Sequence, residues 1–342
     1  MSERIARFFS KSNSDALVLV AGNRPDSNFL YLSGLPLDNS LLMYSRSGGA
    51  SLFVNSINKN EAIREAGRFD VVAFKDKAEL YKKASEFLSG CRSVALDMTS
   101  MNAKTYQRFK KRLKPKRFSD ASGDLLSMRS AKEEGEISIL KQSAKIARKI
   151  IGNLEIGPGM TEISVLRQLL IAAIEHDSTP SFDPIVLSGP NTAMPHGKPS
   201  KRKISNGDVV LIDFGVRHKW YCSDLTRCVF IGRCETEREQ YLGLKGVFDT
   251  LVKEFRAGST GSSIWGECNA LMQESGFGKM IHSPGHGIGL DVHERPSLFK
   301  KSRDKLTSRT CFAIEPAFYI PGKYGLRHED NFSICGKRMK LL

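Results

Sequence analysis

Short apolar runs and helical segments alternate along the first part of the chain. Runs rich in Val, Leu, Ala and Phe predict β-strands at 16–20, 41–44, 50–54, 71–74 and 94–96. Helices are expected at 77–88 and 103–113, and a short helix is expected before the first strand. This succession predicts a small α/β unit.

A stretch rich in Ser, Asp and Gly at 118–130 follows this unit. We place a domain boundary there, which divides the chain into domains 1–125 and 126–342. Beyond the boundary, apolar residues recur at spacings of three and four and predict an amphipathic helix through Ile137, Leu140, Ala144, Ala147 and Ile151. Thr161 is expected to cap a second helix at 162–176, and further helices are expected at about 236–256 and 262–275.

The composition is typical of a soluble globular protein, with 342 residues of which 40% are hydrophobic and 26% charged. No apolar run approaches the roughly 18 residues of a membrane helix, so no membrane partner is expected. The seven cysteines are odd in number and include no C-x-x-C pair. This pattern argues against a disulfide framework and favours a cytoplasmic location.

The formal net charge of +15 allows two interpretations. Nucleic-acid-binding proteins often carry such a charge. Here, however, basic residues recur along the whole chain, with small clusters at 111–117 and 198–203, and no basic motif is interleaved with aromatic residues. We therefore interpret the charge as a solvated basic surface and do not expect nucleic acid as a partner.

Two aspartates stand in the strand-like runs 209–214 and 221–231, which flank the connection GVRHKW. Asp213 and Asp224 are equidistant from the middle of that connection, so a symmetric hairpin places them opposite each other, with Cβ atoms roughly 4.5–5.5 Å apart. Opposed like charges need a shared proton, an arginine or a metal ion to neutralise them. Alternatively, one aspartate caps a turn and the pair never meets, because the connection lacks the Gly or Asn of a tight turn.

Two more acids occupy apolar surroundings. Glu315 lies within the run TCFAIEPAFYI, where an unpaired carboxylate is costly, although the following proline indicates a bend that could carry it to solvent. In GLRHEDNFSI, an extended strand places Arg327 and Glu329 on one face and His328 and Asp330 on the other. Arg327 would then either orient a ligating carboxylate or form an ordinary surface pair.

Three of the chain's seven histidines lie in HSPGHGIGLDVHERP, at 282–296. Alternating apolar residues at 288–292 predict a strand. His286 and His293 are seven residues apart and face opposite sides of a straight strand, so a bend at the glycines is needed to bring both to one pocket. His196 lies on a loop flanked by Pro and Gly, where a lone histidine is often merely structural or exposed.

One hypothesis explains these positions together. Asp213, Asp224, Glu315 and Glu329 supply four carboxylates and His286 supplies one imidazole. Four negative charges balance two divalent cations, and the set is too rich in oxygen for a structural zinc site. Two ions roughly 3.5–4 Å apart that share a hydroxide form the two-metal arrangement of many hydrolases. Mn, Co, Fe and Zn all suit such ligands.

The motifs resemble those of the pita-bread metallopeptidases, the family of methionine aminopeptidase, prolidase, Xaa-Pro aminopeptidase and creatinase. The resemblance rests on HG (196–197), DFG…SDLTR (213–227), HSPGHGIGLDVHERP (282–296), IEPAFYIPG (314–322) and GLRHED (325–330). It implies an α+β fold with a pita-bread catalytic domain at 126–342. The run DALVLVAGNRPDSNFLYLSGL is similar to the creatinase-like N-terminal α/β domain of the proline-directed branch.

The resemblance also implies the role of each metal ligand. Asp213 is implied to chelate one ion, Asp224 and Glu329 to bridge both, and His286 and Glu315 to hold the second. The implied cofactor is two divalent metal ions per chain, with manganese favoured among Mn, Co, Fe and Zn.

The remaining catalytic roles come from the same resemblance. His196 and His293 are implied to contact the substrate and stabilise charge on the scissile carbonyl oxygen, without binding metal. Glu315 is implied to pass the proton of the attacking water to the leaving nitrogen. Thr226 and Arg327 are expected to support the ligands.

The implied function is a dinuclear metal-dependent peptidase that hydrolyses Xaa-Pro bonds in short proline-containing peptides, by attack of a metal-bridged hydroxide. The compact chain favours an Xaa-Pro dipeptidase (prolidase). Alternatives are an Xaa-Pro aminopeptidase acting on longer peptides, a broader aminopeptidase or amidohydrolase, and a non-catalytic member that binds nucleic acid or a partner. A homodimer is also implied. His282 is left as structural, and Trp220 stands where the family often has Gly.

Overall fold

The computed structural model describes residues 3–342 except 24, 68, 114 and 116. The chain divides into two compact units, Met1–Arg129 and Ser130–Leu342. The boundary expected after residue 125 lies inside helix α6 (Ser122–Ser130). Residue 24 belongs to the creatinase-like run and residues 114 and 116 to the basic cluster at 111–117, so these parts of the sequence-based predictions lie outside the described residues.

The N-terminal unit is built on one mixed six-stranded sheet with the order β4-β3-β2-β1-β5-β6. Its strands are β1 (Ala16–Val20), β2 (Leu41–Ser45), β3 (Gly49–Asn55), β4 (Asp70–Phe74), β5 (Ser93–Leu96) and β6 (Arg117–Asp120). The first three pair antiparallel in succession, and the outer strands pair parallel. The five predicted strands are confirmed to within one residue, whereas β6 was not predicted.

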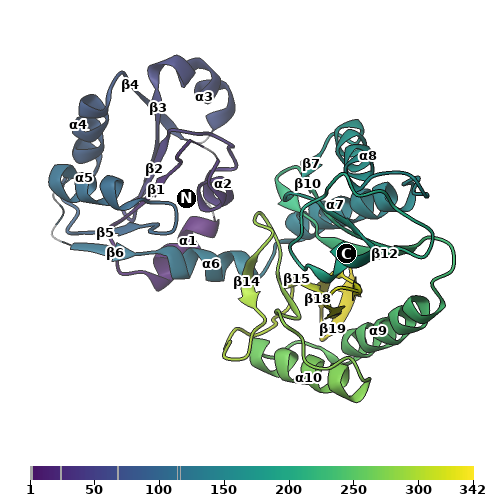
Figure 1. Cartoon of the computed structure of the whole chain (residues 1–342). Helices are drawn as coiled ribbons and strands as arrows, with labels where there is room; N and C mark the ends of the chain where they lie inside the picture. Colours follow the sequence, from purple (N-terminus) through teal and green to yellow (C-terminus); the bar gives the residue numbers. More distant parts are fainter. Residues whose placement is uncertain (1–2, 24, 68, 114, 116) are drawn as a thin grey trace. The chain divides into compact units, whose positions relative to one another are not determined.

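The N-terminal unit also contains helices. They are α1 (Glu3–Lys11), α2 (Ser27–Ser33), α3 (Lys59–Ala66), α4 (Lys77–Phe87), α5 (Ala103–Leu113) and α6, with a 3₁₀ turn η1 at Ser56–Asn58. Helices α4 and α5 lie side by side against the sheet (Figure 1). The buried side chains there are Ala84, Leu88, Phe109 and Leu113, which pack against residues of β1 and β2. The predicted helices at 77–88 and 103–113, and the short helix at the N-terminus, are confirmed.

The C-terminal unit contains several small sheets, with the orders β12-β9-β8, β11-β10-β7, β14-β13-β15-β18-β19 and β16-β17. Its strands are β7 (Thr179–Pro180), β8 (Ile185–Ser188), β9 (Val209–Phe214), β10 (Val216–His218), β11 (Tyr221–Cys222), β12 (Leu225–Phe230), β13 (Gly285–Gly287), β14 (Glu294–Ser297), β15 (Cys311–Ile314), β16 (Ala317–Ile320), β17 (Tyr324–Arg327), β18 (Asp330–Cys335) and β19 (Arg338–Leu341). A 3₁₀ turn, η2, spans Gly189–Ala193.

Two pairs of helices enclose these sheets (Figure 1). The pairs are α7 (Glu134–Gly152) with α8 (Glu162–Glu175), and α9 (Glu235–Glu254) with α10 (Gly261–Glu274). The first pair shares a core with the inner faces of β8, β9 and β12. The second pair packs on a core that includes β15, β17 and β18. All four predicted helices are confirmed, and the unit combines helices and strands as an α+β fold.

Local chemistry explains where these helices begin. The Thr161 hydroxyl accepts a hydrogen bond from the backbone N–H of Ser164, and the Ser164 hydroxyl accepts one from the backbone N–H of Thr161, so the predicted cap of α8 is a full capping box. Thr260 and Ser263 repeat the arrangement at α10. In the part of the chain that the structure describes, no helix is both long and apolar enough to cross a bilayer.

Candidate active site

The strands β9 to β12 bring Asp213 and Asp224 to one side of the C-terminal unit. Asp213 pairs with Thr226 rather than with Asp224, because the chain turns at Lys219 and Trp220, one position later than expected. Both turn residues have positive φ, of 47° and 74°, as in a type I′ turn. The predicted direct opposition of the aspartates is therefore wrong. They are instead diagonal neighbours on one face, two positions apart in register.

Glu315 and Glu329 both lie at breaks between strands. The apolar run at 310–320 is interrupted at Glu315, between β15 and β16, where the following proline indicated a bend. The bend does not carry this carboxylate to solvent, since its side chain is 17% exposed and lies 3.7 Å from His282 Nδ1. Glu329 lies between β17 and β18 and forms an isolated bridge with Thr226 of β12. The two breaks thus turn both glutamates toward the aspartates.

The predicted division of faces at 325–334 is confirmed. The hydroxyl of Thr226 donates to Glu329 Oε2 at 2.8 Å and accepts from Arg327 Nε at 2.9 Å, so these two side chains converge on one partner. His328 packs instead against aromatic rings of α9, and Asp330 forms ion pairs of 2.7 and 2.6 Å with two arginines. Neither His328 nor Asp330 faces the carboxylate cluster.

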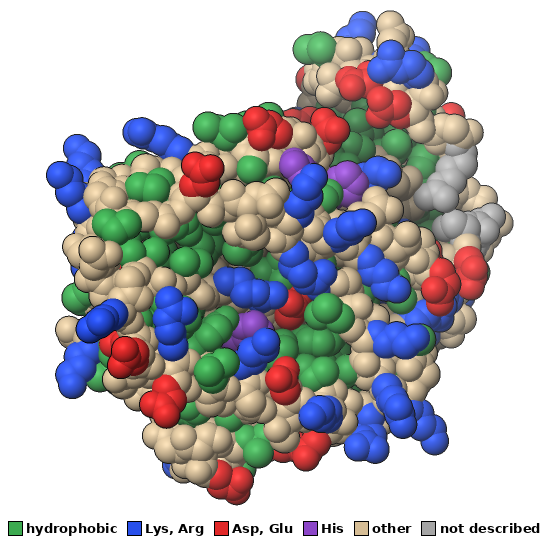
Figure 2. Space-filling view, turned by 90° about the vertical axis from the view of Figure 1, so that its right-hand side faces the viewer, with side chains coloured by type: hydrophobic (Ala, Val, Ile, Leu, Met, Phe, Trp, Pro, Cys, Tyr) green, Lys and Arg blue, Asp and Glu red, His purple; other side chains and the backbone are tan. Residues whose placement is uncertain are grey.

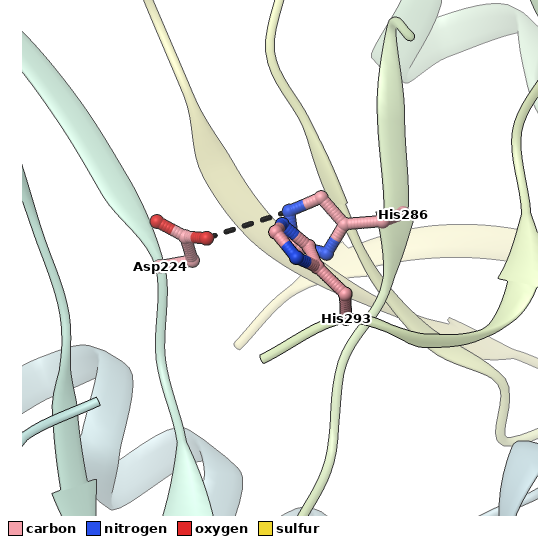
Figure 3. A group of neighbouring side chains, drawn as sticks. All are labelled: Asp224, His286 and His293. Carbon is pink, nitrogen blue, oxygen red and sulfur yellow. Dashed lines mark ion pairs between the residues drawn. The ribbon is translucent and has the colours of Figure 1, made fainter. Parts of the chain in front are cut away.

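His286 and His293 reach the same pocket despite their odd spacing. Their ring centroids are 4.1 Å apart, and His286 Nε2 lies 3.4 Å from Asp224 Oδ2 (Figure 3). His286 Nδ1 lies 3.1 Å from the carbonyl oxygen of Gly287, which favours a proton on Nδ1 and leaves Nε2 toward the acids. Gly285 has φ 155°, and a Cβ there would lie 2.0 Å from a backbone oxygen of β15, so no larger residue fits.

The expected strand at 288–292 is absent, and the segment turns between β13 and β14. A Cβ on Gly289 would approach the carboxylate of Glu294 to 2.4 Å, so the turn closes tightly on this acid. The ammonium of Lys132 donates to Glu294 Oε1 at 2.6 Å, and both side chains are almost fully buried. This buried pair holds the turn that carries His293.

The carboxylates repel one another inside the protein. Burial raises the pKa of Asp213 to about 7, although Arg327 opposes the shift. Burial, with the charge of Glu329, raises the pKa of Glu315 to about 8. The same two causes raise the pKa of Asp224 well above its usual value. The cluster therefore carries more negative charge than the neighbouring protein groups neutralise.

The donor set fits divalent cations. Asp213 Oδ1, Asp224 Oδ1 and Glu329 Oε1 are buried and have no hydrogen-bond partner. One donor atom from each of these three residues lies within 4.8 Å of the others, and the same holds for His286, Glu315 and Glu329. Buried acceptors without donors are costly, and cations would supply both the missing contacts and the missing charge. All five expected ligands thus converge.

Tyr319 is a supporting residue that was not identified from the sequence. Tyr319 accepts a hydrogen bond of 2.9 Å from Arg327, which also binds Asp213 through its second amino group. The Tyr319 hydroxyl lies 3.0 Å from His282 Nε2. Arg327 is therefore fixed between a tyrosine and a carboxylate, and His282 belongs to the same network. A lone tyrosine in an apolar strand carries no signal that distinguishes this role from core packing.

The exposed His196 lies on the loop after η2. The carbonyl of the preceding residue, Pro195, accepts a hydrogen bond of 3.4 Å from Arg327, so the loop contacts the residue that holds Asp213. Burial lowers the pKa of His282, and the charge of His196 acts in the same direction. His196 thus borders the site without joining the acidic cluster.

Glu162, at the start of α8, accepts hydrogen bonds from both ends of this loop. Its Oε1 accepts hydrogen bonds from the amide and hydroxyl of Ser188 and from the amide side chain of Asn191, at 2.7, 2.9 and 3.0 Å. Its Oε2 accepts from the amide and hydroxyl of Ser200 at 2.9 and 2.6 Å. Because Glu162 is fully buried, we infer that it positions the segment that carries His196.

Replacing Glu162 by Gln is expected to loosen this loop. Hydrogen bonds to a charged acceptor contribute roughly 1.5–3 kcal/mol each, so the free energy of unfolding should fall by about 2–4 kcal/mol. If His196 contacts the substrate as the resemblance implies, misplacing it should lower kcat/KM by about 10- to 100-fold, while metal content stays unchanged. Glu175→Gln, at the exposed end of the same helix, is the matched control. Wild-type stability in the Glu162 variant would contradict the inference.

Known proteins share this architecture over nearly the whole chain. Metallopeptidase family M24 matches residues 138–334, and the Creatinase/Prolidase N-terminal domain matches residues 2–131. An Xaa-Pro dipeptidase of Pyrococcus horikoshii is 31% identical over 99% of this chain and 95% of the relative. Solved structures of an Xaa-Pro dipeptidase from Bacillus anthracis (28% identical, 98% and 96% of the two chains) and an X-Pro aminopeptidase from Thermotoga maritima (27%, 98% and 97%) superpose with TM-scores of 0.91.

The convergent acids and the two-unit α+β architecture define a metallopeptidase with a pita-bread catalytic domain. The chain belongs to metallopeptidase family M24 and carries the Creatinase/Prolidase N-terminal domain. The fold and family expected from the sequence are therefore confirmed.

Proposed function

We propose that this metallopeptidase hydrolyses Xaa-Pro bonds in short peptides and acts chiefly as an Xaa-Pro dipeptidase. The observation that carries the proposal is the buried group of carboxylates with three unsatisfied oxygens, a site suited to divalent cations. Full-length similarity to an Xaa-Pro dipeptidase supports the choice of substrate. Xaa-Pro aminopeptidase activity on longer peptides is the second candidate, supported by the equally good superposition on an X-Pro aminopeptidase.

The cofactor we propose is two divalent metal ions per chain, with manganese preferred because carboxylates dominate the donor set. Asp213 would bind one ion, Asp224 and Glu329 both, and His286 and Glu315 the other. When bound, such ions polarise the scissile carbonyl and lower the pKa of a water so that it becomes a nucleophile near neutral pH. Four carboxylates balance the charge of two such ions.

The protein's own groups have the following proposed roles. Glu315 accepts the proton of the attacking water and delivers it to the leaving nitrogen, which is tertiary in an Xaa-Pro bond and departs only when protonated. His293 and His196 donate hydrogen bonds to the substrate and offset the negative charge that develops on its carbonyl oxygen. Thr226 and Arg327 hold Glu329 and Asp213 in place.

Removal of metal is expected to abolish activity reversibly. Dialysis against a chelator should eliminate hydrolysis of Ala-Pro, and readdition of Mn²⁺ should restore it, with two ions bound per chain by elemental analysis. A panel of Ala-Pro, Met-Ala and Xaa-Pro-Xaa peptides then separates dipeptidase, general aminopeptidase and Xaa-Pro aminopeptidase activity. Metal-loaded protein that cleaves no Xaa-Pro peptide would contradict the proposal.

We propose that the functional domains are 1–125 and 126–342, that two chains associate as a homodimer, and that the protein acts in the cytoplasm. Free thiols at all seven cysteines suit a reducing compartment. Sedimentation analysis of the full chain tests the dimer.

A further inference from the structure

The positive charge of the chain is unevenly distributed between the two units. Residues 1–129 contain 22 Lys and Arg against 13 Asp and Glu, a net charge of +9, whereas the larger C-terminal unit carries +6. Within 104–117 alone there are eight Lys or Arg and no Asp or Glu. On the face drawn in Figure 2, by contrast, Lys and Arg side chains are scattered among acidic and neutral ones. The peptidase mechanism uses none of the residues at 104–117.

Part of this charge lines a groove on the N-terminal unit. The groove, of about 740 Å³, lies along α4 and α5, and four exposed cations border it: Lys77, Lys82, Arg108 and Arg112. Among the described residues that line it, Glu86 is the one acid. Among the described residues, no ion pair joins any of the four cations to a carboxylate. Their charge is therefore available to a ligand.

Helical spacing arranges the two arginines of the groove in one row, which Lys104 extends outside the groove lining. On α5, Lys104, Arg108 and Arg112 follow one another at intervals of four residues, or about 6 Å along the helix axis. A row of evenly spaced cations favours a chain of regularly repeated negative charges over a single small anion. Arginine adds planar donors that match the paired oxygens of a phosphate.

The rest of the lining suits the other parts of a nucleotide. Ser85 and Ser89 offer hydroxyl groups beside the cations. Tyr81 lines the groove, half buried, and its ring is held edge-to-face against Phe109 at 5.9 Å between centroids. A fixed aromatic ring beside a cationic track is the combination that single-stranded nucleic-acid sites use, with bases stacking on the ring and phosphates following the cations.

We propose that the groove between α4 and α5 binds single-stranded nucleic acid without sequence preference. The sequence-based expectation of no nucleic-acid partner rested on basic residues that recur along the whole chain with only small clusters. The charge count by unit shows instead that the smaller N-terminal unit carries most of the excess positive charge. This proposal is independent of the peptidase activity, since no residue of the groove belongs to the catalytic cluster.

The test measures binding of a fluorescent 20-nucleotide uridine oligomer to the full-length protein at increasing salt. Four cations predict a slope of log K against log salt near about −2.8, given roughly −0.7 per phosphate on a single strand. The variant Arg108→Glu/Arg112→Glu should bind at least about 10-fold more weakly, with a slope near about −1.4. Its unfolding temperature and its hydrolysis of Ala-Pro should equal those of the wild type.

The control is Lys11→Glu/Lys59→Glu, which makes the same charge change on α1 and α3 of the same unit. It should retain most of the affinity. Equal loss in both variants would show that only net charge matters and would overturn the proposal. So would absence of oligomer binding by the wild type, or binding to anionic vesicles that depends on Arg108 and Arg112 when oligomer binding does not.

Discussion

Replacing Asp224 by Asn is expected to remove bound metal and to lower kcat/KM for an Xaa-Pro dipeptide by about 10³-fold or more. Asp224 faces His286 on one side and the other carboxylates on the other, so its loss affects both proposed ions at once. Metal-assisted polarisation is worth several kcal/mol of transition-state stabilisation, and each 1.36 kcal/mol corresponds to about a factor of ten in rate. Elemental analysis and steady-state kinetics measure the two effects.

The same substitution is expected to affect the stability of the apoprotein differently from that of the metal-loaded protein. Without metal, the buried carboxylate of Asp224 is repelled by Glu329 and Asp213, so an uncharged side chain should leave the apoprotein equally or more stable. With Mn²⁺ present, only the wild type should gain unfolding temperature, because only it binds the ions tightly.

Asp208→Asn is the matched control for this comparison. Asp208 is also a buried aspartate and directly precedes β9, but the guanidinium of Arg202 neutralises it at 2.6 and 3.0 Å. Its substitution should lower stability with and without metal and leave metal content unchanged. If Asp224→Asn instead destabilised the apoprotein as much as Asp208→Asn, the carboxylate cluster would not be a cation site.

The candidate site could be predicted from the sequence because its residues break local rules. An acid inside a run such as FAIEPAF or VVLIDF contradicts the apolar pattern around it, and such contradictions concentrate at functional positions. Glu315 and Asp213 were identified in this way. The strands of the N-terminal unit, in contrast, were predicted because they obey the rules, with compact apolar runs bounded by polar residues.

The geometry of the site could not be predicted, because it depends on turns and close contacts that the pattern does not show. The register of Asp213 and Asp224 follows from a turn at Lys219 and Trp220, residues that rarely adopt positive φ. Apolar alternation at 288–292 indicated a strand, but the buried Glu294 and its contact with Gly289 impose a turn instead.

The roles of Glu162 and Tyr319 could not be predicted from the sequence either. Each stands at a position where its residue type is ordinary, the first turn of a helix and an apolar strand. Their importance lies in partners 26 to 38 residues away for Glu162, and in Arg327 and His282 for Tyr319. Long-range hydrogen bonds of this kind leave no periodic signal in the chain.

Replacing His293 by Ala is expected to separate substrate contact from metal binding. If His293 stabilises the developing charge on the carbonyl oxygen, its loss should lower kcat by about 10²- to 10³-fold, as the removal of one such donor typically does. The metal content should stay at the wild-type value, and the unfolding temperature with Mn²⁺ should change little. His286→Ala, the neighbouring histidine, should instead lose metal.

The geometry of the site also permits His293 to bind metal. Donor atoms of Asp224, His286 and His293 lie within 4.8 Å of one another, so His293 is close enough to act as a ligand. His293 is exposed and follows the tight turn at Gly289, and both features favour contact with substrate. Elemental analysis of the two variants decides between the roles, since equal loss of metal in both would make His293 a sixth ligand and leave the substrate oxygen to His196.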